Sequence, residues 1–171
     1  MTELITKPPF RSSYIIDGNL ITLELYRLLS IFYASEKFAT INTTNHDDPV
    51  SILLGYQDSE ITRILTSSAI SARIIDDRDD RYLGEHSTSC GQLIPDLNNP
   101  NSHIALTLRE ACNKIIHAIK IHYDITELAT GLRYVNPTIY YYGRFKGKEW
   151  KATLDVEEYV FNYVTYIAQF N

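Results

Sequence analysis

Three polar residues at helical spacing are the first feature of this sequence that could do chemistry. Arg109, Asn113 and His117 follow one another at intervals of four residues, so a helix would align them along one side. Arginine pairs with phosphate oxygens, and histidine moves protons near neutral pH. The pattern predicts a catalytic set for phosphodiester cleavage, with Arg109 on the phosphate, Asn113 positioning and His117 as general acid or base. That chemistry requires no metal and no cofactor.

The segment from Asn113 to Ala118, Asn-Lys-Ile-Ile-His-Ala, resembles the core motif of the HEPN superfamily, a helical bundle found in ribonuclease toxins and phage-defence proteins. In that family an arginine and a following polar residue precede the histidine, and two subunits commonly share one cleft. The resemblance implies that His117 is the catalytic histidine and that Asn113 is the polar residue. This chain departs from the family pattern at the arginine. Cys112 stands immediately before Asn113, where the family usually has the arginine, and the nearest arginine, Arg109, is separated from His117 by seven residues.

The resemblance implies a metal-independent ribonuclease, or a protein that binds RNA or a nucleotide, of toxin or phage-defence type. It also implies a homodimer. The alternative is a non-catalytic module that binds a protein partner. In that interpretation Arg109 and Asn113 hold neighbouring helices together, and His117 is solvated or hydrogen-bonded at a helix contact.

A second group of residues suited to nucleic acid follows later in the chain. Two runs rich in β-forming residues, 138–145 and 149–154, flank a turn that contains glycine and predict a β-hairpin. Arg144, Lys146 and Lys148 accompany several aromatic residues there and are the predicted nucleic-acid contacts, because single strands bind aromatic platforms beside positive charge. Alternatively, every second aromatic side chain packs on the protein while the lysines keep an edge strand soluble.

The elements that would position these residues are mainly helical. Apolar residues at helical period predict helices over 17–40, from Asp58 to about residue 81, from about His103 to Tyr123 with Ser102 as its cap, and over 156–170 with Asp155 as its cap. Residues 84–102 are rich in turn formers and predict a long loop. The expected fold is mainly α, a helical bundle of about four main helices with a β-hairpin inserted before the last helix. Residues 1–171 would form a single HEPN-like domain.

Composition excludes several classes of protein. The net charge of −5, from 16 basic and 21 acidic residues, does not suit a protein that mainly binds duplex DNA. Two cysteines are too few for a disulfide framework or a cysteine-rich zinc site. No apolar run approaches the ~20 residues of a membrane span, and the amino terminus lacks a signal core. A cytoplasmic location without membrane contact is expected.

Three weaker candidates are set aside. The segment from His86 to Gly91 contains the thiol of Cys90, but proximity in a loop supplies neither an oriented base nor an oxyanion site. Residues 46–48, His-Asp-Asp, are adjacent and cannot all reach one ion without a special turn. His117 and His122 are five residues apart, a poor helical spacing for a shared zinc ion.

Overall fold

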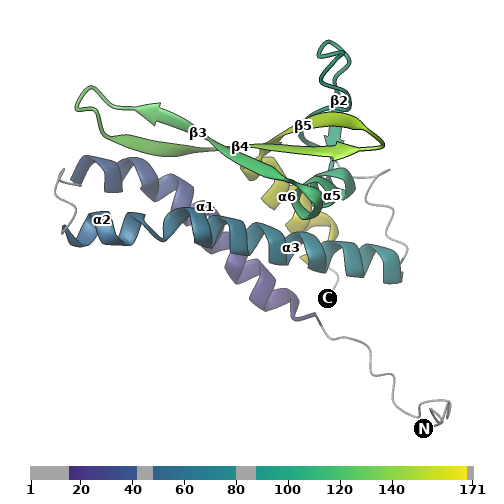
Figure 1. Ribbon diagram of the computed structural model, residues 1–171. Helices are drawn as coiled ribbons and strands as arrows, with labels where there is room; N and C mark the ends of the chain where they lie inside the picture. Colours follow the sequence, from purple (N-terminus) through teal and green to yellow (C-terminus); the bar gives the residue numbers. More distant parts are fainter. Residues whose placement is uncertain (1–15, 42–47, 80–87, 169–171) are drawn as a thin grey trace, which may run out of the picture.

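The structure is a computed structural model that describes residues 16–41, 48–79 and 88–168. Helices and strands alternate irregularly along the chain (Figure 1). Their order is α1 (Gly18–Ile41), α2 (Pro49–Leu54), α3 (Gln57–Asp79), β1 (Ser89–Ile94), β2 (Ile104–Thr107), α5 (Leu108–His117), β3 (Lys120–Glu127), β4 (Arg133–Phe145), β5 (Lys148–Asp155) and α6 (Val156–Tyr166).

The strands form one antiparallel sheet in the order β2-β1-β5-β4-β3. Figure 1 shows the long helices together on one side of this sheet, so the molecule has two layers. Side chains of β4 and β5 alternate accordingly: Ile139, Tyr141, Trp150 and Leu154 are buried beneath the sheet. The opposite face of the sheet, here called the open face, has no helix over it among the described residues.

The expected fold class, a mainly helical bundle with one hairpin, is wrong. A five-stranded antiparallel sheet is present, and the fold mixes helix and sheet. Much of the error lies in the predicted helix His103–Tyr123. Only Leu108–His117 is helical, and its cap is Thr107, whose side chain accepts a hydrogen bond from the Glu110 amide. Strands β2 and β3 occupy the two flanks.

The physical reason is a change of period within a continuous apolar pattern. Ile119, Ile121, Tyr123 and Ile125 alternate with polar residues, which is the pattern of a half-buried strand, and β3 pairs there with β4. The predicted loop 84–102 contains β1, a short strand that is held by hydrogen bonds to neighbours on both sides. Strand β2 follows β1 directly, but the other partner, β5, lies 57 to 63 residues later, so the segment's own sequence does not show the pairing that makes β1 an inner strand.

Three other helices and the hairpin are confirmed. Asp17 accepts hydrogen bonds from the amides of Asn19 and Leu20 at the start of α1. Asp155 accepts from the Glu158 amide and caps α6 as expected. The β4–β5 turn consists of Lys146 and Gly147, with φ angles of 48° and 80°; positive φ at both positions is the geometry that tight hairpins prefer.

The core lies between the sheet and the helices. Its largest buried side chains come from α1, α3, α5, α6 and the covered face of the sheet: Leu25, Leu28, Ile61, Ile64, Leu65, Ile75, Leu106, Leu108, Ile139, Tyr159 and Tyr163. Helix α5 is short but occupies a central position, since it contacts α3, α6 and four of the strands. Polar residues on the flank of α5 are therefore held by packing on several sides.

Candidate functional site

Helix α5 presents Arg109, Asn113 and His117 beside its buried face. Leu108, Ala111, Cys112 and Ile115 fill the core from this helix, and the remaining positions reach its flanks and surface. The structure brings the three polar residues onto one helix, as expected. It gives them different surroundings, however, and only two of the three line a common depression.

Arg109 connects α5 to α3. Its guanidinium forms ion pairs with Asp76 and, at 3.0 Å, with Asp77. The Asp76 side chain is only 1% exposed, and a buried carboxylate requires a compensating positive charge. Arg109 therefore neutralises carboxylates of α3 and holds α5 against that helix. This is the non-catalytic role that the sequence also allowed for Arg109.

Asn113 continues the same network toward the surface. Its Oδ1 accepts a hydrogen bond from Arg73, and its Nδ2 donates to Glu110 Oε1 over 3.2 Å. Arg73 in turn donates to both carboxylate oxygens of Asp77, at 3.2 and 3.1 Å. This chain of polar contacts fixes the orientation of the Asn113 amide.

A depression of about 570 Å³, here called the α5 depression, lies between α5 and the β4–β5 hairpin. It is lined by Glu110, Asn113, Lys114, His117, Arg144, Phe145 and Trp150. The fold thus places His117 from one predicted group beside Arg144 from the other. Among the described residues His117 has no hydrogen-bond or ionic partner, so its imidazole is available to a ligand.

The two cations around this depression, Lys114 and Arg144, differ in how strongly other side chains hold them. Lys114 lies 3.4 Å from a Glu110 oxygen, with its ammonium 4.8 Å from the centre of the Trp150 ring. Arg144 pairs with Glu149 at 2.8 Å, and both side chains are about 60% exposed. Exposed pairs of this kind contribute little, so a phosphate could replace Glu149 as the partner of Arg144 at small cost.

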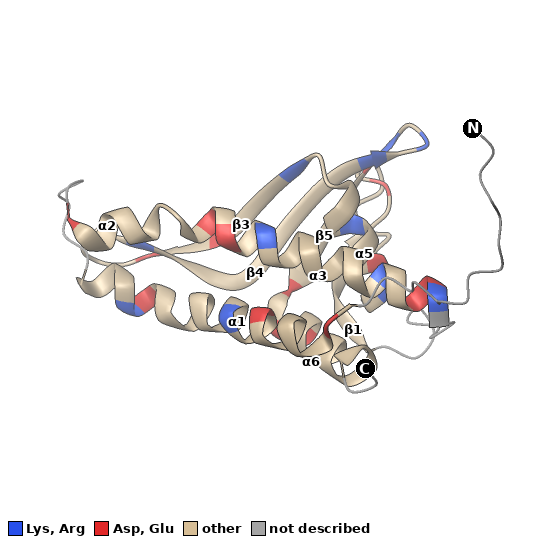
Figure 2. Ribbon diagram, turned by 90° about the horizontal axis from the view of Figure 1, so that it is seen from below, with Lys and Arg blue, Asp and Glu red and all other residues tan. Residues whose placement is uncertain are grey.

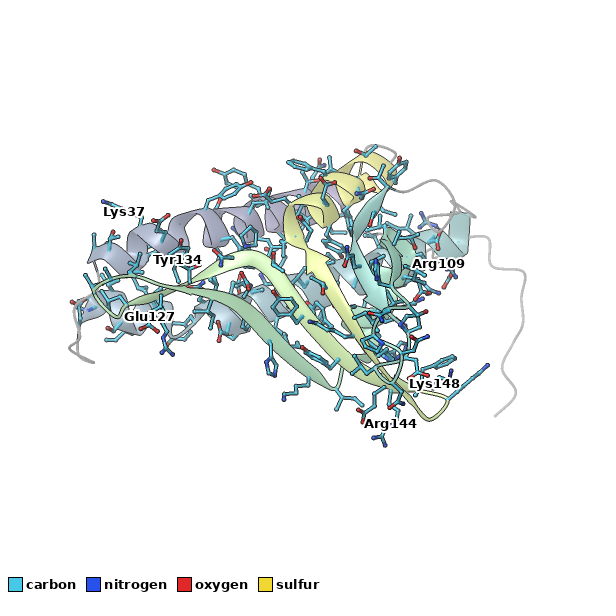
Figure 3. All side chains as sticks on the ribbon, turned by 90° about the horizontal axis from the view of Figure 1, so that it is seen from above. Lys37, Arg109, Glu127, Tyr134, Arg144 and Lys148 are labelled. Atoms are coloured by element: carbon cyan, nitrogen blue, oxygen red, sulfur yellow. The ribbon has the colours of Figure 1, made fainter. Side chains whose placement is uncertain are left out.

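The other two predicted nucleic-acid contacts lie at the end of the hairpin. Lys146 is in the turn, with its ammonium 5.2 Å from the centre of the Phe145 ring. Lys148 pairs with Asp96 at 3.1 Å. Figure 2 shows basic segments at this end of the sheet, and Figure 3 shows Arg144 and Lys148 near one another there, with Arg109 farther away.

A second depression, here called the sheet depression, adjoins the first. Its volume is about 490 Å³, and His122, Lys120 and Tyr142 line it together with Arg144 and Trp150, which also line the α5 depression. Lys120 and His122 are not among the predicted site residues, because the predicted helix from His103 to Tyr123 includes both of them. The alternation of residues 119–125 was the signal that identifies them as strand residues with one face exposed.

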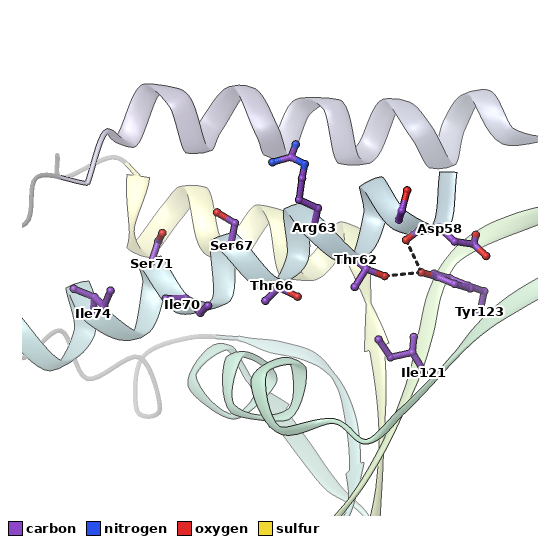
Figure 4. A pocket seen from close by; sticks show the side chains of 11 residues that line it. Asp58, Thr62, Arg63, Thr66, Ser67, Ile70, Ser71, Ile74, Ile121 and Tyr123 are labelled. Atoms are coloured by element: carbon purple, nitrogen blue, oxygen red, sulfur yellow. Dashed lines mark hydrogen bonds between the residues drawn. The ribbon is translucent and has the colours of Figure 1, made fainter. Parts of the chain in front are cut away.

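A groove larger than these two depressions lies elsewhere and has different chemistry. It has a volume of about 910 Å³ between α3 and the edge strand β3 (Figure 4). The Tyr123 hydroxyl contacts Thr62 Oγ1 and donates to the Asp58 carbonyl, each at 3.1 Å. The lining cation, Arg63, is held by Glu24 and Glu60. The described residues that line this groove offer hydroxyl groups, apolar groups and the Asp58 carboxylate, and their one cation is already paired, so the groove does not suit an anionic ligand.

The structure does not support the three weaker candidates, the Cys90 segment, residues 46–48 and the pair of His117 and His122. Burial raises the pKa of Cys90 to about 12, so its thiol is protonated at neutral pH and unsuited to nucleophilic attack. His86, His46 and Asp47 lie outside the described residues, and Asp48 caps α2 by accepting from the Val50 amide. His117 ends a helix and His122 lies in β3. The described parts of the chain contain no group of three or more His, Cys, Asp or Glu residues that could hold a metal ion.

Comparison with known proteins finds no matching family model and no significant match among curated proteins or solved structures. The geometry of the site therefore carries the functional argument. Within the described ranges, no helix has both the length and the apolar character needed to cross a bilayer.

Proposed function

We propose that this protein binds single-stranded RNA at the α5 depression. The observation that carries the proposal is the convergence of His117, Arg144 and the exposed ring of Phe145 on one concave surface. Arg144 supplies a bidentate partner for a phosphate. Phe145 is 62% exposed, and an exposed ring beside a cation is the arrangement on which single-stranded bases stack. The Asn113 amide and the His117 imidazole can hydrogen-bond a ribose or a base edge.

The acidic character of the chain limits how such binding operates. With a net charge of −5, long-range attraction for a polyanion is absent, and affinity must come from short-range contacts. Binding should therefore be modest and sensitive to salt, with a slope set by the few phosphates engaged. An extended duplex, which demands a broad basic surface, is not the expected ligand.

Charge reversal on the hairpin tests the proposal directly. We expect Arg144→Glu to weaken binding of a labelled ten-nucleotide RNA about tenfold or more, because one charge-assisted contact contributes about 1.5 to 3 kcal/mol. The salt slope should also fall by about 0.7, the value for one phosphate of a single strand. Fluorescence anisotropy in EDTA, at several salt concentrations, measures both quantities.

Arg133→Glu is a matched control. Arg133 begins the same strand, β4, and pairs with Glu127 at 2.9 Å, with exposures of 67% and 56% that resemble those of the Arg144–Glu149 pair. Figure 3 shows that Glu127 lies at the opposite end of the sheet from Arg144. Equal effects of the two reversals, or no RNA binding by the unaltered protein, would contradict the proposal.

Cleavage is a second candidate function, favoured by the uncommitted imidazole of His117. In the proposed step, His117 removes the proton from a ribose 2′-hydroxyl. The 2′-oxygen bonds to phosphorus as the bond to the 5′-oxygen breaks, and the departing 5′-oxygen takes a proton from water. Arg144 stabilises the charge on the phosphate. The products are a 2′,3′-cyclic phosphate and a 5′-hydroxyl end.

RNA cleavage can be tested separately from RNA binding. Single-stranded RNA incubated in EDTA should be cut by the unaltered protein and left intact by His117→Ala, while DNA of the same sequence is left intact by both. If neither protein cuts RNA that both bind, the molecule is a binding protein without this activity. If RNA binding is also absent, a module for protein partners becomes the better interpretation.

A further inference from the structure

The open face of the sheet carries aromatic and cationic side chains in register, next to the α5 depression. On β4, Tyr142 pairs with Lys120 of β3 and with Lys151 of β5. Tyr140 lies two residues earlier on the same face and pairs with His122. These side chains come from three adjacent strands. Because Tyr140 and Tyr142 alternate with the buried Ile139 and Tyr141, they lie on the open face, on the opposite side of the sheet from the helices in Figure 1.

The two tyrosines of this surface differ in their contacts. The Tyr140 hydroxyl donates to Asp124 over 3.0 Å, and this hydrogen bond raises the pKa of Tyr140. Asn136 donates to the other oxygen of Asp124, at 2.7 Å, so Tyr140 belongs to a polar network. The rings of Tyr142 and His122 form a T-shaped pair, with centroids 5.5 Å apart. Among the described residues the Tyr142 hydroxyl makes no hydrogen bond.

The two lysines of this surface, Lys120 and Lys151, are weakly held and can move to contact a ligand. The Lys151 ammonium lies 4.6 Å from the centre of the Tyr140 ring and 5.9 Å from that of Tyr142, which is a weak attraction at an exposed position. Lys120 lines the sheet depression and has no ionic partner in the described parts of the chain. A flat base could displace the Lys151 ammonium from the ring of Tyr142, and the ammonium of Lys151 or Lys120 could then reach the adjoining phosphate.

The two depressions share lining residues. Arg144 and Trp150 line both of them, so a strand held in the α5 depression could continue past Arg144 toward Tyr142 and His122. Figure 3 shows Arg144 near the turn of the β4–β5 hairpin. A single strand that follows this route would place one phosphate on Arg144 and consecutive bases on either side of it.

We propose that the sheet depression is a second nucleotide subsite of the same RNA strand, in which a base stacks on Tyr142 and Lys120 or Lys151 holds the next phosphate. The inference rests on the proposed function, since it extends the strand from the α5 depression. The ligand is single-stranded nucleic acid because alternating stacking surfaces and cations fit its repeating base and phosphate.

A length series in two variants tests the subsite. Binding of UpU and of an eight-nucleotide oligouridylate is measured through the fluorescence of Trp150, the single tryptophan of the chain. We expect the unaltered protein to bind the octamer at least about tenfold more tightly than UpU, the gain of roughly one stacked base. Tyr142→Leu should remove most of that gain and leave UpU affinity unchanged.

Tyr134→Leu is the matched control. Tyr134 belongs to the same strand and lies opposite Thr126, at the far end of the sheet from the hairpin (Figure 3). Circular dichroism of both variants establishes that they fold. An octamer affinity that Tyr142→Leu and Tyr134→Leu change equally, or not at all, overturns the second subsite.

The same series separates this inference from the proposed function. If UpU fails to bind while octamer binding depends on Tyr142, the α5 depression is refuted as the primary site and the sheet subsite stands. If UpU binds and Arg144→Glu abolishes it, but Tyr142 has no role, the proposed function stands and the second subsite is refuted. Failure of both ligands to bind refutes both.

Discussion

Replacing Arg109 with methionine distinguishes a structural arginine from a phosphate-binding one. Methionine retains much of the aliphatic volume and removes the charge. The Asp76 carboxylate, 1% exposed, then loses its Arg109 partner. Removing one member of a buried ion pair costs about 3 to 5 kcal/mol. Because the Arg109 side chain is 37% exposed, the loss should lie near the lower end of that range, and the pair with Asp77, which is 54% exposed, adds less than about 1 kcal/mol. We expect the melting temperature to fall by about 6 to 12 °C for a chain of this size.

Urea denaturation followed by circular dichroism measures this loss in the free energy of unfolding. Arg63→Met is the control, since Arg63 is 50% exposed and pairs with Glu24 and Glu60 at the surface; it should cost at most about 1 kcal/mol. Adding Asp76→Asn to Arg109→Met removes the buried charge and should restore part of the stability. The reasoning is refuted if Arg109→Met unfolds as the unaltered protein does, or if it abolishes RNA binding while leaving stability unchanged.

Three further predictions concern stability. Gly91→Ala should lower the free energy of unfolding by about 3 kcal/mol or more, as measured by urea denaturation. The reason is that an added Cβ would lie 2.0 Å from the Thr153 carbonyl oxygen, and Gly91 has a φ of 135°. Gly131→Ala should cost less, because Gly131 has a φ of 80° but an added Cβ would meet no atom within 4 Å. Asp155→Ala removes the α6 cap and should cost about 1 kcal/mol by the same assay. Burial raises the pKa of both Cys90 and Cys112 to about 12 from an ordinary value of 9.0. Stability should therefore be complete below about pH 9 and fall between pH 9 and 12, by up to about 1.4 kcal/mol per pH unit per thiol; a urea midpoint unchanged between pH 8 and 10.5 would contradict this.

Part of the candidate site could be found from residue types alone. The helical interval between Asn113 and His117 places both on one flank of a helix, and the structure has them lining the same depression. The composition of the hairpin selected Arg144, which lines it as well. Arg109 has the same spacing as its two neighbours but binds Asp76 and Asp77. No local pattern reveals this, because α3 lies more than thirty residues earlier in the chain.

The sequence by itself therefore predicts those helices and turns whose stabilising groups lie close by in the chain. The caps Asp17 and Asp155 mark the starts of α1 and α6, and the Lys146–Gly147 turn closes the β4–β5 hairpin. Tertiary structure decided that residues 89–94 form an inner strand, because β1 pairs with β5, 57 to 63 residues later in the chain. Strand β3, in contrast, pairs with the next strand, β4, and its alternating apolar and polar residues are a local signal. Tertiary structure also decided which cations remain available to a ligand. Charge pairing depends on which side chains packing brings together, and spacing along the chain does not contain that information.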